Sequence, residues 1–188
     1  MTTVRNGPKC LPRLRSLLRL LFEAQMELKK SRMLIVGLGN PILGDDGVGW
    51  KVAEEVRKKL TPDLPVVVDC LSLGGINLME HLIGYERAIL IDAFSLDGPI
   101  GSIIVLKLSE LPNYSALHTT SAHDTSLQNA ITLGRSMGAQ LPEEITVVGI
   151  ATRRIYDFSE ELSPPVAQAV PQAVQIVLEL LRQTVITQ

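Results

Sequence analysis

The sequence predicts an α/β fold, a three-layer α/β/α sandwich with a mostly parallel twisted sheet. From residue 33 onward, apolar runs of strand length alternate with stretches of helical periodicity, which is typical of successive βαβ units. Residues 88–91 show no polar alternation, as expected of a central strand buried on both faces. Because 188 residues suit a single domain, we expect one α/β domain over residues 33–188.

We expect these elements in chain order: a strand at 33–38, a helix at 46–60, a strand at 66–69, a helix at 76–82, strands at 87–92 and 102–108, a helix at 124–137, a strand at 144–150 and a helix at 166–181. Trp50 and Val52 help to anchor the first helix to the sheet. The alternating run at 102–108 indicates an edge strand. Pro164 and Pro165 precede the last helix, where a missing N–H costs little.

Residues 1–32 form a basic extension outside this pattern. They carry eight basic and two acidic residues, whereas the whole chain has a formal net charge of −2. Leucines at three- and four-residue steps indicate a basic amphipathic helix over residues 11–30. We expect a solvated extension or a misassigned start, with a membrane-surface or partner-docking helix as the alternative.

The composition argues against several classes of protein. The 18 basic and 20 acidic residues nearly balance and aromatic residues make up 4%, so we expect no nucleic-acid partner. Cys10 and Cys70 lack Cys-x-x-Cys spacing, which indicates neither a disulfide framework nor a zinc site and fits a reduced, cytoplasmic compartment. No apolar run approaches the about 20 residues of a transmembrane helix.

The most informative stretch joins the first strand to the first helix and reads Gly-Leu-Gly-Asn-Pro-Ile-Leu-Gly-Asp-Asp-Gly-Val-Gly from Gly37. A dinucleotide-binding loop would use such glycines, with Asp69 binding a ribose, but Ile42 replaces the third glycine. The acidic pair Asp45 and Asp46 would also repel a pyrophosphate. Peptidyl-tRNA hydrolases begin similarly, but that resemblance implies a catalytic histidine soon after Asn-Pro, and the first histidine here is His81.

Three polar residues stand where ligands bind in such sheets, beyond the carboxyl ends of the strands. Asp46 follows the first strand, Asp92 ends an otherwise apolar strand, and His123 precedes a predicted helix. Each has a simpler interpretation: Asp45 or Asp46 caps the helix, Asp92 accepts loop N–H groups, and His123 faces water. Together, two carboxylates and one imidazole match the ligand set of a borderline divalent cation.

With these motifs the sequence resembles the hydrogenase maturation endopeptidases of [NiFe]-hydrogenase biogenesis, over roughly residues 33–181. The resemblance implies an α/β/α sandwich and an aspartic-type endopeptidase. It also implies cleavage of a C-terminal extension from the hydrogenase large-subunit precursor after nickel insertion, with Asp46, Asp92 and His123 as the residues that contact the metal. Many members read Asp-x-Gly-Thr after the second strand, where this chain has Asp69-Cys70-Leu71-Ser72.

We expect the nickel to be borne by the substrate and contacted only transiently, so that its presence certifies a loaded precursor. The alternative is a non-enzymatic nickel-binding adaptor or delivery module with the same three ligands. No Gly-x-Ser-x-Gly elbow or His-Glu-x-x-His helix is present. We expect Cys70, His81 and His118 to have structural roles.

Overall fold

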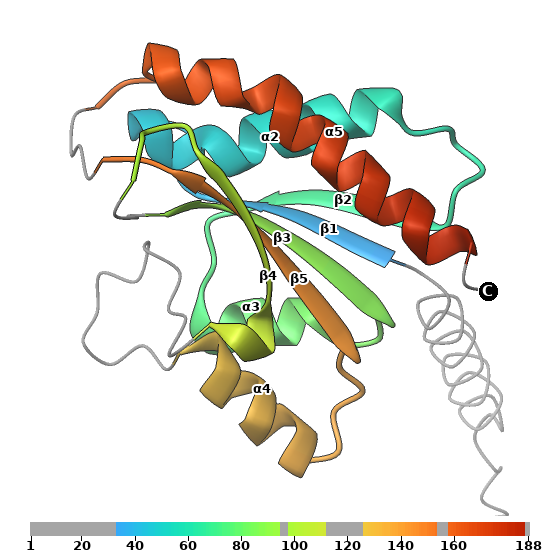
Figure 1. Ribbon diagram of the computed structural model, residues 1–188. Helices are drawn as coiled ribbons and strands as arrows, with labels where there is room; N and C mark the ends of the chain where they lie inside the picture. The colour runs from blue at the N-terminus through green and yellow to red at the C-terminus, as the bar shows by residue number, and fades with distance from the viewer. Residues whose placement is uncertain (1–32, 95–97, 112–125, 154–157, 187–188) are drawn as a thin grey trace, which may run out of the picture.

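The computed structural model describes residues 33–94, 98–111, 126–153 and 158–186, and it confirms the predicted α/β/α sandwich. A five-stranded sheet lies between two helical layers (Figure 1). In chain order the elements are β1 (Met33–Leu38), the 3-10 helix η1 (Gly44–Gly47), α2 (Val48–Lys59), β2 (Val66–Leu71), α3 (Gly75–Leu82), β3 (Arg87–Phe94), β4 (Ile103–Lys107), the 3-10 helix η2 (Leu108–Glu110), α4 (Leu127–Ser136), β5 (Glu144–Ala151) and α5 (Pro164–Ile186).

The sheet has the strand order β2-β1-β3-β5-β4. Strands β2, β1, β3 and β5 pair in parallel, and β4 pairs antiparallel with β5 at one edge, as its alternating sequence predicts. The chain leaves β1 toward β2 on one side and later places β3 on the other side. The crevice outside the carboxyl ends of β1 and β3 is therefore the switch point at which ligands bind in open α/β sheets.

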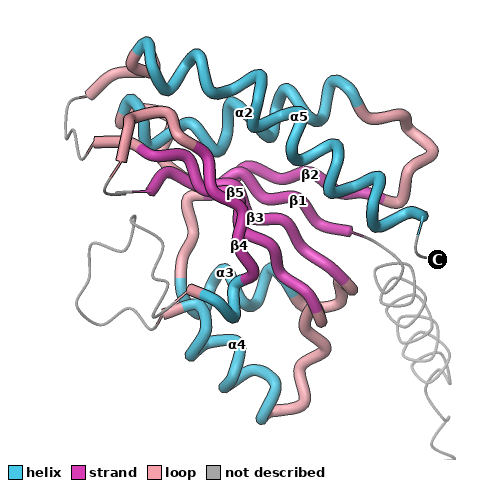
Figure 2. Tube along the Cα trace, in the orientation of Figure 1, coloured by secondary structure: helices cyan, strands magenta, loops and turns pink. Residues whose placement is uncertain are grey.

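Each face of the sheet carries its own apolar core. Figure 2 shows α2 and α5 over one face and α3 and α4 over the other. Along β1, Ile35 belongs to the α2/α5 core, whereas Leu34 and Val36 belong to the α3/α4 core. This alternation is the period-2 geometry of a strand buried on both sides, and the uninterrupted apolar sequence of the central strands follows from it.

The start of α2 packs directly against the ends of two strands because its second residue is glycine. A Cβ built on Gly49 would overlap the carbonyl oxygens of Leu38 and Ile91. Gly39, with φ of +130°, has a backbone conformation that favours glycine, and a Cβ there would overlap the carbonyl oxygen of Asp46. The glycine pattern therefore serves close backbone packing between η1, α2 and the sheet.

Several expected boundaries were wrong. The first helix begins at Val48 instead of residue 46, because residues 44–47 form the tighter turn of η1. The second strand extends to Leu71 and the third to Phe94, so that Asp92 does not end its strand, since the last residues of both still pair with neighbouring strands. The helix expected from residue 124 begins at Leu127, where the Ser126 hydroxyl accepts a hydrogen bond from Asn129 N at 3.3 Å.

The extension at residues 1–32 lies outside the described residues, so its predicted helix and the boundary at residue 33 stay predictions. None of the helices in the described part of the chain is both long and apolar enough to cross a membrane.

We predict that Gly49→Ala lowers the free energy of unfolding by about 1–3 kcal/mol, because the new methyl group must displace two strand-end carbonyl groups. Gly98→Ala is the matched control, since a Cβ there meets only Ser102 Oγ at 3.8 Å. Urea denaturation of both variants checks this. Equal stability of the two variants would contradict the packing argument.

Candidate active site

Asp46 lies in η1, directly beyond the carboxyl end of β1. Its side chain is partly buried, and its Oδ2 accepts a hydrogen bond from Asn40 N at 2.7 Å. The Asn40 side chain in turn accepts from Ile42 N at 3.2 Å, which closes the turn after the strand. The turn sequence therefore fixes one carboxylate at the switch point.

Asp92 is the sixth residue of β3 and is fully buried, with 0% exposure. Its Oδ1 accepts from Ala93 N at 2.8 Å. Asp92 has the same strand parity as Ala88 and Leu90, which belong to the α3/α4 core, so its side chain projects toward that layer. It is one of two buried charged side chains in the part of the chain that the structure describes, the other being Asp45.

The two aspartates come to the same edge of the sheet. Strands β1 and β3 are adjacent, with Gly37 paired to Ile91, so Asp92 lies next to the end of β1. Gly49 packs against the carbonyl groups of Leu38 and Ile91, near the carboxyl ends of both strands. The predicted convergence of Asp46 and Asp92 on one edge thus agrees with the topology, whereas a role in metal contact stays a prediction.

His123 lies outside the described residues. Ser126, three residues later in the sequence, caps α4. Helix α4 runs back along the sheet to the start of β5 on the face toward which Asp92 projects (Figure 1). Among the described residues, no three His, Cys, Asp or Glu side chains gather in a way that could hold a metal ion.

The idea that the acidic pair caps the first helix was wrong. The N-cap residues of η1 and α2 are Leu43 and Gly47, and neither makes a capping hydrogen bond through its side chain. Asp45 is 5% exposed and accepts from Ser163 N at 2.6 Å and from Ser163 Oγ at 2.8 Å. Neighbouring aspartates therefore have different partners, and Ser163 is a residue that the sequence argument missed.

The remaining candidate residues described by the structure have structural partners. Cys70 packs against the α2/α5 core, and its Sγ lies 3.9 Å from the Trp50 carbonyl oxygen. Burial is the largest cause that raises the pKa of the Cys70 thiol, which disfavours the nucleophilic thiolate. His81 Nε2 lies 2.9 Å from Asp69 Oδ2, so the carboxylate considered for a ribose is engaged with a histidine. His118 lies outside the described residues.

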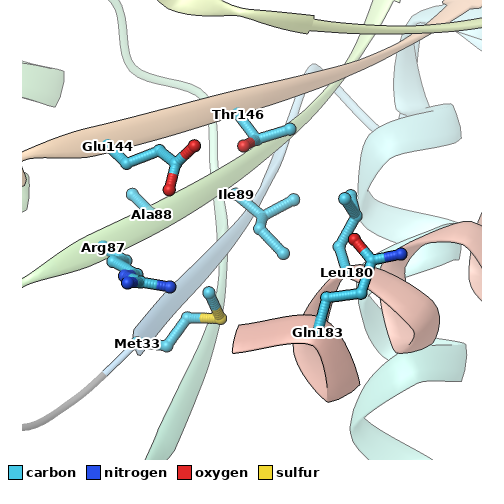
Figure 3. A pocket seen from close by; sticks show the side chains of 8 residues that line it. All are labelled: Met33, Arg87, Ala88, Ile89, Glu144, Thr146, Leu180 and Gln183. Carbon is cyan, nitrogen blue, oxygen red and sulfur yellow. The ribbon is translucent and has the colours of Figure 1, made fainter. Parts of the chain in front are cut away.

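A cavity of about 280 Å³ lies at the opposite edge of the sheet (Figure 3). It is lined by the first residues of three parallel strands, Met33, Arg87 and Glu144, and on the other side by Leu180 and Gln183 of α5. The amino ends of the strands are remote from the edge that carries Asp46 and Asp92. This cavity is therefore separate from the candidate active site.

Comparison with known proteins gives a consistent family. The sequence profile described as hydrogenase maturation protease matches residues 50–180, a span that contains Asp92 and His123 and begins just after Asp46. A putative hydrogenase maturation protease of Methanocaldococcus jannaschii is 32% identical over 154 residues, covering 80% of this chain and 97% of that protein. The hydrogenase expression/formation protein HupD of Rhizobium leguminosarum is 26% identical over 151 residues, covering 80% of this chain and 74% of that protein.

Solved structures agree with these relatives. The hydrogenase 2 maturation peptidase from a Thaumarchaeota archaeon superimposes with a TM-score of 0.59 at 31% identity, covering 80% of this chain and 98% of that chain. The hydrogenase maturating endopeptidase HybD from E. coli gives a TM-score of 0.64 at 24% identity, covering 81% of this chain and 93% of that chain. At that identity the second comparison supports the fold alone.

We predict that the Cys70 thiol is alkylated slowly in the folded protein. Because burial raises its pKa, a smaller fraction is thiolate at any given pH, so the alkylation rate should rise at higher pH than in the unfolded chain. Iodoacetamide labelling of a Cys10→Ser variant, with and without urea, isolates Cys70. If the alkylation rate of the folded protein instead rose at lower pH than that of the unfolded chain, Cys70 would again be a candidate nucleophile.

Proposed function

Because this chain belongs to the hydrogenase maturation protease family, we propose that it removes the C-terminal extension of a [NiFe]-hydrogenase large-subunit precursor after nickel insertion. The observation that carries the proposal is the placement of Asp46, beyond the end of β1, and of Asp92, near the carboxyl end of the neighbouring parallel strand β3, at the switch point of the sheet. Ligand sites of open α/β sheets lie at this place. The chain is accordingly a peptide hydrolase whose site faces a protein substrate.

The proposed recognition uses the nickel ion as part of the substrate. Carboxylate oxygens from Asp46 and Asp92 and an imidazole nitrogen from His123 suit a borderline divalent cation. Three ligands contributed from separate segments of the chain bind a free ion weakly, but for an ion already fixed by the precursor the remaining ligands come from the precursor itself. The site then engages only a precursor that carries metal, and this engagement also orients the scissile bond.

The different exposure of the two carboxylates suggests an order of contact. Asp46 is partly buried, whereas Asp92 is fully buried within β3. A substrate-borne ion therefore meets Asp46 first. It reaches Asp92 only after the segments of this protein that bury the Asp92 side chain move aside. We propose that Asp46 makes the initial contact and Asp92 completes the site once the precursor is bound.

The hydrolysis itself requires only water as co-substrate. The water oxygen forms a bond to the carbonyl carbon of the scissile peptide, the C–N bond breaks, and the released amine takes a proton. Either the ion or an adjacent carboxylate activates the water in this scheme. Removal of the extension then frees the new C-terminus of the large subunit.

We predict that Asp46→Asn, Asp92→Asn and His123→Ala each lower the rate of precursor cleavage by about 100-fold or more, because each removes a ligand or a proton acceptor from the site. Asp63→Asn in the exposed turn before β2 is the matched control and should cleave at the wild-type rate. Gel-based kinetics with nickel-loaded precursor measure this. Wild-type rates for the three site variants would refute the proposed ligand set.

Intact-mass spectrometry of both proteins after mixing with nickel-loaded precursor tests the function itself. Peptidase activity predicts a large subunit whose mass falls by that of one C-terminal peptide, while the mass of this chain stays unchanged. A nickel-binding adaptor predicts full-length large subunit and nickel bound stoichiometrically to this chain, which would overturn the proposal.

We also predict that deletion of residues 1–32 leaves cleavage intact. The elements of the sandwich begin at Met33, and Asp46 and Asp92 both belong to these elements, in η1 and β3. Equal cleavage rates for the shortened and full chains would agree with this. Loss of cleavage by a shortened chain that unfolds at the wild-type temperature would instead make the extension part of the substrate-binding surface.

A further inference from the structure

The turn that carries Asp46 is fastened to the segment just before α5. Gly44 N donates to the Ser159 carbonyl oxygen at 2.6 Å, and Ser159 N donates to the Ile42 carbonyl oxygen at 3.1 Å. These bonds form a small parallel bridge between Leu43 and Ser159. A four-residue 3-10 helix such as η1 has little stability of its own, so these outside contacts fix its position.

Asp45 makes the strongest part of this attachment. Its two carboxylate oxygens accept from Ser163 N at 2.6 Å and from Ser163 Oγ at 2.8 Å, across 118 residues of sequence. Asp45 is 5% exposed, so its carboxylate is shielded from water. Hydrogen bonds to a charged group contribute most to stability in such a shielded place. The pair therefore joins η1 to the beginning of α5.

Ser163 stands at the start of α5. The Ser163 carbonyl accepts from Ala167 N at 2.9 Å, the first helical hydrogen bond of α5, so Ser163 stands at the N-cap position. A serine there usually caps its own helix by accepting an N–H from the first turn. A hydroxyl can donate and accept at the same time, so the bond to Asp45 is compatible with capping, and the positive end of the α5 dipole favours the Asp45 carboxylate.

We propose that Asp45 is a positioning residue that holds the Asp46 carboxylate at the active site by anchoring η1 to the start of α5. This inference rests on the proposed function, since it assigns Asp46 to the site that meets the substrate. The two aspartates are adjacent in one short turn, so a shift of η1 moves Asp46. The Asn40 amide, which donates to Asp46 Oδ2 at 2.7 Å, reports the position of that carboxylate.

The test compares Asp45→Ala and Asp45→Asn with Val177→Ala, a control that truncates a fully buried side chain of α5 far from Ser163. Asp45→Asn keeps an oxygen for Ser163 N and an N–H for Ser163 Oγ. At saturating nickel-loaded precursor, we expect Asp45→Ala to lower the cleavage rate by about 10-fold or more, because small misplacements of reacting groups are costly. Asp45→Asn should recover most of that rate, and Val177→Ala should retain it.

Amide hydrogen exchange measured by NMR supplies a second readout that does not depend on activity. Asp45→Ala should accelerate exchange of the Asn40 amide by about 10-fold or more, because the turn opens more often, while Val177→Ala leaves it near the wild-type value. Wild-type cleavage by Asp45→Ala, equal losses in Asp45→Ala and Val177→Ala, or unchanged Asn40 exchange would each overturn the inference.

The same experiment separates the inference from the proposed function. If the wild-type chain fails to shorten nickel-loaded precursor, the proposed function is wrong and the assigned purpose of Asp45 falls with it. The exchange data still decide whether Asp45 positions η1. If the wild-type chain cleaves and Asp45→Ala cleaves equally well, only the positioning role is wrong.

Discussion

The close approach of α2 to the ends of β1 and β3 is the constraint on which the candidate site depends. Gly49 lies where any side chain would overlap the carbonyl groups of both strands. This contact seats the helix over the switch point, and the turn before it must then fold tightly as η1. The consequence is that Asp46 lies beyond β1, beside the strand that carries Asp92. Packing of backbone against backbone therefore decides where the two carboxylates lie.

The architecture was predictable because burial on both faces leaves a local trace in the sequence. Central strands read as unbroken apolar runs, and helices between them follow a 3.6-residue period. The edge position of β4 also follows from its alternating residues. Element ends were harder, since they depend on interactions that a local pattern lacks. Residues 44–47 form a 3-10 helix, and α4 begins only after the serine that caps it.

The candidate site was predictable in part. Asp92 stood out because a charge in an otherwise apolar strand needs a partner or a ligand. The division of roles between Asp45 and Asp46 could not be deduced, because it depends on Ser163, which is 118 residues away in the chain. The local sequence marks Ser163 only as the start of a helix, since a serine followed by proline is typical of an N-cap. Only the fold connects the Ser163 hydroxyl with Asp45.

The dependence of cleavage on nickel in the substrate tests the central claim most directly. One preparation of large-subunit precursor is divided, one half is loaded with nickel, and both halves are incubated with the wild-type chain under chelator-free conditions. The account predicts that the loaded precursor loses its C-terminal extension while the metal-free precursor stays intact. Equal cleavage of both, with the metal-free precursor shown to be folded, would contradict recognition of the metal by Asp46, Asp92 and His123.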